Sequence, residues 1–145
     1  MEKSLLLSKS YGRSVLWLCA VLLAFCSTFL HAQQALLSAE EAFPVQVESV
    51  TAQKVQLHWD IPEHYYLYQH KFEVRQGQHV LPLKLPKAED LHDDNYGQTQ
   101  VYYQQVQFNV PTQASQTYQV TWQGCAKDRI CYPPQTIEFK TDADG

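Results

Sequence analysis

The amino-acid sequence predicts an all-β protein built as an antiparallel β-sandwich. From Pro44 onward, apolar side chains alternate with polar ones, which is the period of a half-buried strand rather than of a helix. Turn-forming residues separate the alternating runs, and no segment carries a convincing long helical pattern. Short strands without long helices favour two packed sheets, and the chain after residue 32 is long enough to enclose one such core.

The expected strands follow one another with short connections. The alternating runs occupy residues 45–47, 55–59, 66–74, 81–85, 106–110, 118–122 and 137–139. The turn signals between them are Asp60-Ile61-Pro62, Gln76-Gly77, Tyr96-Gly97 and Pro111-Thr112. The aromatic side chains that share the apolar phase of these runs, and that we therefore expect in the core, are Trp59, Phe72, Phe108 and Phe139.

Residues 1–32 are typical of a secretory signal peptide. Lys3, Lys9 and Arg13 supply a positive segment, an apolar run follows, and Ala32 is a suitable last residue before cleavage. An uncleaved membrane anchor is one alternative, although the apolar run is short for a spanning helix. A lipoprotein signal at Leu23-Ala24-Phe25-Cys26 is another, although Phe25 is bulky for the position before the cysteine. In each interpretation the rest of the chain is exported to a compartment that permits disulfides.

The remainder of the chain divides into a short connection and one domain. Residues 33–43 are expected to form a flexible lead-in, in which residues 38–42 can make one helical turn. The folded domain is expected to span residues 44–142, because the strand-like pattern runs through this range without internal repeats or low-complexity tracts. The sequence therefore predicts a single domain after the signal peptide.

The charge of the chain argues against a nucleic-acid partner. The whole chain has a net charge of −4, and the part after residue 32 carries 8 basic and 14 acidic side chains. A nucleic-acid-binding domain needs a basic surface, which this composition lacks. An acidic surface is compatible with protein partners that are selected by complementary charge.

Cys125 and Cys131 are the only cysteines after residue 32. A disulfide between them would close a loop of seven residues and stabilise the fold by only about 2–2.5 kcal/mol through chain entropy. The spacing leaves three interpretations open, namely a structural disulfide across a turn, a redox-active pair and a metal site. A C-x₅-C spacing is unusual for zinc, and no second Cys/His pair complements it.

Thiol–disulfide exchange needs a thiolate that attacks, a second thiol that resolves the mixed disulfide, and access for a partner. Between the cysteines, Lys127 and Arg129 favour a thiolate electrostatically, whereas Asp128 opposes it. The pair Pro133-Pro134 stiffens the exit from the loop. The histidines after residue 32 show no ligand spacing and are expected to be surface or strand residues without a metal; they are His58, His64, His70, His79 and His92.

Three motifs resemble one known family. The segment from Gly124-Cys125 to Cys131-Tyr132-Pro133-Pro134 resembles the active-site segment of the N-terminal periplasmic domain of the thiol:disulfide interchange protein DsbD. Tyr65-Tyr66-Leu67-Tyr68 resembles the tyrosine-rich strand of that domain, and Asp93-Asp94-Asn95-Tyr96-Gly97 resembles its cap loop. The resemblance covers about residues 40–140 and implies an immunoglobulin-like sandwich located in the periplasm.

The resemblance also implies roles for individual residues. Cys125 and Cys131 would form a redox-active disulfide, in which Cys131 makes the intermolecular mixed disulfide and Cys125 resolves it. The residues implied to line or cap this pair are Tyr66, Tyr68, Asp93, Asp94, Asn95 and Tyr96. The family carries a bulky aromatic residue where this sequence has Asn95, so either the pair is more exposed here or Tyr96 shields it instead.

The function implied by the resemblance is that of a protein-disulfide reductase. Such a domain needs no cofactor, because the cysteines themselves carry the electrons. The implied reductant is a thioredoxin-like domain of the C-terminal DsbD type, and the implied acceptors are disulfide isomerases and cytochrome c maturation thioredoxins. A membrane-domain partner is expected in cis or in trans. The alternative is an immunoglobulin-like binding module whose C-x₅-C disulfide is structural.

Overall fold

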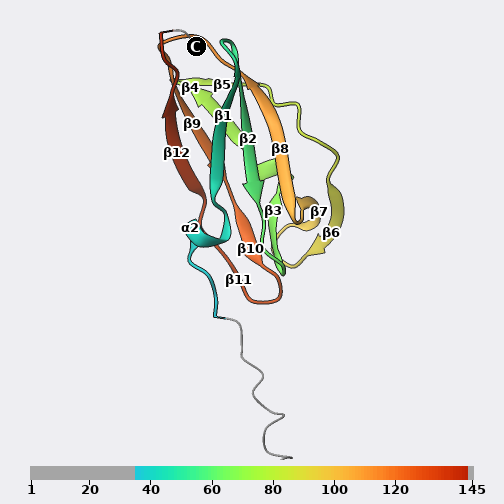
Figure 1. Cartoon of the computed structure of the whole chain (residues 1–145). Helices are drawn as coiled ribbons and strands as arrows, with labels where there is room; N and C mark the ends of the chain where they lie inside the picture. Colours follow the sequence, from blue (N-terminus) through green and yellow to red (C-terminus); the bar gives the residue numbers. More distant parts are fainter. Residues whose placement is uncertain (1–34, 144–145) are drawn as a thin grey trace, which may run out of the picture. The chain divides into compact units, whose positions relative to one another are not determined.

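The computed structural model describes residues 35–143, and the described chain from Leu36 onward forms one compact unit. Within this range the secondary structure is dominated by antiparallel strands, which confirms the predicted all-β class (Figure 1). The helical elements of this range are α2 (Ala39–Ala42) and the 3-10 helix η2 (Gln69–Lys71). The signal peptide predicted for residues 1–32 lies outside the described residues.

The strands form three sheets (Figure 1). The first sheet has the order β1 (Val45–Thr51), β2 (Lys54–Asp60), β8 (Gln105–Pro111). The second has the order β12 (Gln135–Lys140), β9 (Thr117–Trp122), β4 (Glu73–Gln76), β5 (His79–Val80). The third has the order β11 (Ile130–Cys131), β10 (Gly124–Ala126), β3 (Tyr65–Tyr68), β7 (Gly97–Tyr102), β6 (Glu89–Asp93).

The main core lies between the first and second sheets. Trp59 of β2 is fully buried, and its ring contacts the rings of Phe72 and Phe108 at centroid distances of 5.0 and 5.7 Å. It also meets Trp122 of β9, in the facing sheet, at 5.4 Å. Phe139 of β12 is half-buried and stacks on Tyr118. The expected core aromatics therefore join the two layers of a sandwich.

The second and third sheets are continuous through one long strand pair that is interrupted in the middle. β4 pairs with β9, and β3 pairs with β10. Between these two pairings, η2 separates β3 from β4 and Gln123 separates β9 from β10. The backbone N–H of Tyr68 donates a hydrogen bond to the Gln123 carbonyl at 3.0 Å, which holds the two interrupted strands together. This junction lets one strand pair serve two different sheets.

The prediction of one continuous strand over residues 66–74 is wrong. The 3-10 helix η2 interrupts the run, and the side chains on its two sides enter different clusters. Phe72 and Val74 belong to the main core, whereas Tyr66 and Tyr68 belong to a second buried cluster. The even-numbered alternation persists through the interruption, so the sequence pattern alone does not reveal that the buried face changes.

The strand predicted over residues 81–85 is also not formed. β5 ends at Val80, and the following segment is irregular. Pro82 and Pro86 lack the backbone N–H that a ladder requires. Leu81, Leu83 and Leu85 nevertheless pack half-buried against the main core. The alternation therefore reported the buried side of this segment correctly, but not its backbone conformation.

The segment expected as a flexible lead-in contributes to the core. Ser38 begins α2 with a capping box to Glu41, in agreement with the predicted helical turn. Phe43 is 1% exposed, and its ring meets Tyr132 edge-to-face at a centroid distance of 5.6 Å. The backbone of Leu37 accepts a hydrogen bond from the Tyr132 hydroxyl at 2.6 Å. The segment around α2 is therefore packed against the end of the sandwich that carries the cysteines.

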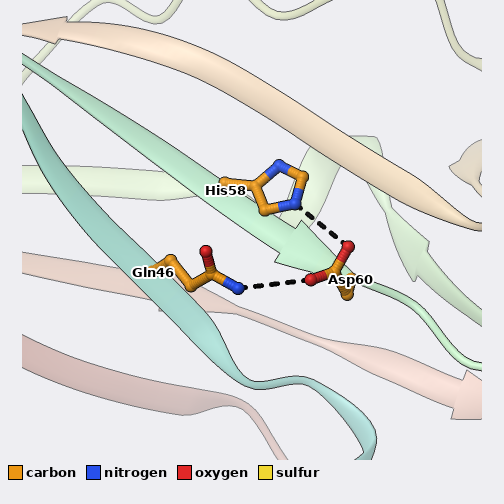
Figure 2. A network of polar contacts seen from close by, with 3 residues as sticks. All are labelled: Gln46, His58 and Asp60. Atoms are coloured by element: carbon orange, nitrogen blue, oxygen red, sulfur yellow. Dashed lines mark hydrogen bonds and ion pairs between the residues drawn. The ribbon is translucent and has the colours of Figure 1, made fainter.

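The outward face of the first sheet is polar. Asp60 accepts hydrogen bonds from the Gln46 amide at 3.2 Å and from the His58 ring at 3.1 Å, which links β1 to β2 (Figure 2). These side chains alternate with the buried Leu57 and Trp59. Among the residues that the structure describes, no helix is both long and apolar enough to cross a membrane.

Candidate active site

The two cysteines lie directly opposite each other on a short hairpin. β10 pairs with β11 with Cys125 opposite Cys131, and the two sulfurs form a disulfide. The hairpin closes through a turn in which the Arg129 N–H donates to the Ala126 carbonyl at 3.1 Å. Asp128 has a φ of 57°, a left-handed conformation that Asp tolerates better than most residues. The polar residues between the cysteines thus serve the turn.

Burial distinguishes the two sulfurs. Cys125 is 1% exposed and lies on β10, which is covered by β3 on one side and by β11 on the other. Cys131 is exposed, because β11 is the edge strand of its sheet. Ile130 beside it is 43% exposed. Since exchange requires direct approach of a partner sulfur, Cys131 is the accessible member of the pair.

Gly124 allows the cysteine strand to lie close to its neighbours. A Cβ at this position would come within 2.3 Å of the Tyr66 carbonyl oxygen and 2.6 Å of the Phe43 ring. It would also meet the Leu67 side chain at 2.8 Å. Because two backbones and a core ring converge here, no larger residue fits without displacement. Close packing therefore explains why a glycine precedes Cys125 in the sequence.

β3 separates the main core from a second buried cluster, which we call the site cluster: Tyr66, Tyr68, Val101 and Cys125. Tyr68 is fully buried, and its hydroxyl oxygen lies 3.1 Å from Cys125 Sγ and 3.7 Å from Cys131 Sγ. Tyr66 packs edge-to-face against Tyr68 at a centroid distance of 5.3 Å. The disulfide therefore lies beside two packed tyrosine rings, and the Tyr68 hydroxyl is close to both of its sulfurs.

Asp93 ties the tyrosines to the cap loop, residues 93–97. The hydroxyls of Tyr66 and Tyr68 both donate to Asp93 Oδ2 at 2.7 Å. The backbone N–H groups of Asn95 and Tyr96 donate to Asp93 Oδ1 at 2.8 and 3.1 Å. A single buried carboxylate thus satisfies four donors and fixes the position of the loop above the disulfide.

The hydrogen bonds of Asp93 determine the ionisation of this group. Burial alone would raise the pKa of Asp93, but the four hydrogen bonds to its charged form outweigh burial and lower the pKa below its ordinary value. Burial, together with the Asp93 carboxylate, raises the pKa of Tyr68 to about 12, although its hydrogen bond with Tyr66 opposes the shift. Burial also raises the pKa of Tyr66. At neutral pH the site therefore holds one carboxylate and two neutral phenols.

The cap loop directs its two central side chains differently. Asn95 Nδ2 donates to Cys131 Sγ at 3.5 Å. The Tyr96 ring instead packs against the rings of Tyr68 and His70, at 4.9 and 5.0 Å, and the ammonium of Lys71 lies 4.5 Å from its centroid. Asn95, and not Tyr96, is therefore the cap-loop side chain that contacts a sulfur.

The structure groups most of the residues predicted for the site. Those brought together around Cys125 and Cys131 are Tyr66, Tyr68, Asp93, Asn95 and Tyr96. Asp94 does not join them, because it is exposed and makes no hydrogen bond or ion pair with another described residue. Successive side chains of an extended chain point to opposite sides, which accounts for the burial of Asp93 and the exposure of Asp94.

Sequence reasoning missed two residues at the edge of the site, His70 and Lys71 of η2. Both contact the Tyr96 ring, and His70 also lies 5.4 Å from the Tyr68 ring. Burial and the neighbouring Lys71 charge lower the pKa of His70. The sequence offered one signal for His70, which follows Tyr68 by two residues in the same alternating run. Within residues 35–143, no group of three His, Cys, Asp or Glu side chains is placed to hold a metal ion.

Comparison with known proteins yields a family match along the whole described domain. The model of the family described as "Thiol:disulfide interchange protein DsbD, N-terminal" matches residues 33–143. Thiol:disulfide interchange protein DsbD 1 of Pseudomonas aeruginosa is 38% identical over 75% of this chain. The DsbD protein of Pasteurella multocida is 43% identical over 72% of this chain. The match spans only 19% and 18% of these two relatives, so the chain corresponds to about a fifth of their length.

Solved structures agree with this match. The reduced N-terminal domain of DsbD from Neisseria meningitidis superposes with a TM-score of 0.67 and 29% identity, over 76% of this chain and 92% of that one. The complex between the DsbD N-terminal and PilB N-terminal domains of the same organism gives a TM-score of 0.61 and 28% identity, over 72% and 86% of the two chains. The likeness confirms the immunoglobulin-like sandwich that the resemblance implied. The chain therefore belongs to the family of DsbD N-terminal domains.

Proposed function

We propose that this domain carries out thiol–disulfide exchange through Cys125 and Cys131, as a protein-disulfide reductase. The observation that carries the proposal is the asymmetry of the disulfide, in which Cys125 is buried against Tyr68 and Cys131 is exposed on an edge strand. One accessible sulfur and one protected sulfur are what a two-step exchange requires. The family membership supports the same activity.

In the first step, the Cys131 thiolate of the reduced domain attacks one sulfur of a partner disulfide. A bond forms between Cys131 Sγ and that sulfur, and the partner's other sulfur leaves as a thiolate and takes up a proton. Because Cys131 is exposed and its neighbour Ile130 offers an apolar contact, the partner can approach this side of the hairpin. Lys127 and Arg129 lie on the same hairpin and favour the thiolate form.

In the second step, Cys125 loses its proton and attacks Cys131 Sγ. The Cys125–Cys131 bond forms, and the partner sulfur leaves as its second thiolate. Two electrons have then passed to the partner, whose two thiolates exchange protons with solvent, and the domain is oxidised. A thioredoxin-like reductant returns the two electrons by the reverse sequence, so no cofactor takes part.

Tyr68 and Asp93 position the resolving cysteine in this scheme. The Tyr68 proton is directed to Asp93, so the lone pairs of the hydroxyl oxygen remain available to accept from the Cys125 thiol after reduction. The lowered pKa of Asp93 makes its carboxylate a weak proton acceptor, so we do not assign it the role of general base. Asp93 instead fixes the orientation of Tyr68.

The partners and location follow from the relatives and remain part of the proposal. A Neisseria meningitidis relative is described in complex with the PilB N-terminal domain, which supports a separate protein domain as partner. We propose a thioredoxin-like domain of the C-terminal DsbD type as reductant, and disulfide isomerases and cytochrome c maturation thioredoxins as acceptors. Residues 1–32 favour export, and we propose the periplasm as the compartment, with a membrane domain as a further partner.

Trapping of the mixed disulfide tests the assignment of the two cysteines. The probe is a thioredoxin-like domain whose single remaining cysteine carries a thionitrobenzoate group. Cys125→Ser should release the coloured thiol rapidly and accumulate a mixed disulfide on a non-reducing gel, whereas Cys131→Ser should react far more slowly. Equal trapping by the two variants, or the reverse order, would refute the assignment. Both variants should fold, because only about 2–2.5 kcal/mol of loop closure is lost.

A further inference from the structure

The two sulfurs face groups of opposite polarity. Cys125 Sγ lies 3.1 Å from the Tyr68 hydroxyl oxygen, whose proton is directed to Asp93, so an acceptor faces this sulfur. Cys131 Sγ lies 3.5 Å from the amide nitrogen of Asn95, which is a donor, and farther from the Tyr68 hydroxyl oxygen, at 3.7 Å. An acceptor favours the protonated thiol, and a donor favours the thiolate. After reduction, the surroundings therefore favour a thiol at Cys125 and a thiolate at Cys131.

The position of Asn95 is fixed by its own backbone and by its neighbour. Its N–H donates to Asp93 Oδ1 at 2.8 Å, which holds the start of the cap loop. The Tyr96 ring is held on the other side, between His70 and Lys71. With Tyr96 engaged there, the Asn95 amide is left facing Cys131. The contact between the Asn95 amide and Cys131 Sγ therefore depends on the conformation of the cap loop as well as on the Asn95 side chain.

Resting on the proposed exchange function, we propose that Asn95 is a catalytic residue whose side-chain amide donates a hydrogen bond to the Cys131 sulfur and stabilises its thiolate. The cap loop then activates the attacking cysteine. The same contact defines the order of attack, because only Cys131 has a donor at its sulfur among the side chains of the site cluster and the cap loop. Asn95 acts on the reacting atom itself and neither gains nor loses a proton.

The expected effect follows from the balance between thiolate fraction and nucleophilicity. Loss of the donor should raise the pH at which Cys131 titrates by about one unit, which lowers the thiolate fraction at neutral pH about tenfold. A more basic thiolate is intrinsically more nucleophilic, with a Brønsted coefficient of about 0.4–0.5. The net rate of attack at neutral pH should therefore fall about threefold.

The test measures the pH dependence of alkylation of the reduced domain by iodoacetamide, with modification of Cys131 followed by peptide mass spectrometry. Three changes are compared with the unchanged protein. Asn95→Leu removes the donor at similar size, and Asn95→Asp also adds a negative charge. Gln98→Leu is the matched control, because it replaces an exposed amide on β7 that makes no contact with the sulfurs.

The midpoint of the alkylation profile separates activation from access. We expect a higher midpoint for Asn95→Leu, a still higher one for Asn95→Asp, and no change for Gln98→Leu. An altered limiting rate at high pH with an unchanged midpoint would show that Asn95 only covers the sulfur and would overturn the proposal. An unchanged profile would overturn it as well. If Cys131 still traps the probe while the midpoint is unmoved, only this inference fails; if Cys131 does not trap it, the proposed function fails.

Discussion

The two faces of β3 carry different kinds of structure. On one face, Tyr65 and Leu67 enter the main core, where apolar and aromatic side chains pack between the two layers. On the other face, Tyr66 and Tyr68 enter the site cluster, where a buried carboxylate and a disulfide replace much of the apolar packing. A four-residue strand buried on both sides thus separates the main core from the site cluster, to which we assign the proposed thiol–disulfide exchange.

This difference shows how a small sandwich can hold a disulfide that has one buried and one exposed sulfur. The main core stabilises the fold by burying apolar side chains. Such packing tolerates exchange of one apolar residue type for another but is sensitive to changes in side-chain volume. The site cluster is stabilised by a hydrogen-bond network, whose members must all be satisfied. Substitutions on the first face should therefore change stability with little change in exchange, and substitutions on the second face should change exchange with a smaller change in stability.

The largest effect is expected for Leu67→Ala, on the main-core face of β3. Leu67 is fully buried, so truncation should leave a cavity and lower the free energy of unfolding by about 2–5 kcal/mol. The midpoint of urea denaturation measures this loss. The rate of thiol exchange under folding conditions should stay within about twofold of the unchanged protein. A large fall in exchange by the folded variant would show that the two faces are coupled.

Gly124→Ala should have the next largest effect, because Gly124 lies where the two faces meet. The added Cβ would approach the Tyr66 carbonyl to 2.3 Å, so the cysteine strand must shift, at a cost of about 3 kcal/mol in unfolding free energy. Gly77→Ala is the matched control. A Cβ added at Gly77 would meet nothing within 4 Å, so this variant reports only the backbone strain of a side chain at a φ of +57°. Similar losses for the two variants, measured by urea denaturation, would contradict the close-packing explanation.

Asp93→Asn should have an intermediate and pH-dependent effect. Loss of charge-assisted hydrogen bonds should lower the unfolding free energy at pH 7 by about 1–3 kcal/mol. The pKa of Asp93 is lowered in the folded state, so its contribution is fully present above the unfolded value of about 4. It is lost as the pH falls toward the folded pKa, because the unfolded chain takes up the proton first.

Urea denaturation of the Asp93→Asn variant and of the unchanged protein, at pH values from 7 to 3, measures this difference. The gap between the two unfolding free energies should be constant down to about pH 5 and should narrow below about pH 4. A gap that widens in acid would mean that Asp93 is protonated in the folded protein. That outcome would contradict the network in which Asp93 accepts four hydrogen bonds.

The smallest effect distinguishes the two tyrosines of the site face. Tyr66→Phe and Tyr68→Phe each remove one 2.7 Å hydrogen bond to Asp93, so each should cost about 1 kcal/mol of stability. Only Tyr68 contacts the sulfurs. Loss of the acceptor for the Cys125 thiol should destabilise the reduced form and make the reduction potential more negative by about 10–30 mV in Tyr68→Phe alone. Equal potentials for the two variants would remove Tyr68 from the redox site.

Local patterns in the sequence predicted the main core well. The alternation around Trp59, Phe108 and Trp122 reports burial directly, because a strand with one solvated face must alternate. The strands β6 and β7 escaped this reasoning because β6 is polar and mostly exposed, so it carries no apolar period. The face change of β3 also escaped it, since a 3-10 helix shifts the buried side without altering the even-numbered spacing.

The candidate site was predictable as a set of motifs but not as a geometry. The motifs identified the residues that come together at the site. The hydrogen bonds from Tyr66 and Tyr68 to Asp93, however, join residues 25 or more positions apart and depend on strand pairing that no local pattern encodes. This is why Asp93 and Asp94 were treated alike, although only Asp93 is buried. The orientation of Asn95 toward Cys131 likewise depends on the contacts that hold Tyr96 elsewhere.

The central claim is that the Cys125–Cys131 disulfide is an exchanging pair and not a structural staple. Equilibration of the domain with a graded dithiothreitol redox buffer, followed by quantification of free thiols, gives its reduction potential directly. Structural disulfides typically lie below about −300 mV. The exposed Cys131 and the short loop predict a value clearly above that limit. A value below it, together with no reaction with a thioredoxin-like domain, would contradict the account and favour an immunoglobulin-like binding module with a structural disulfide.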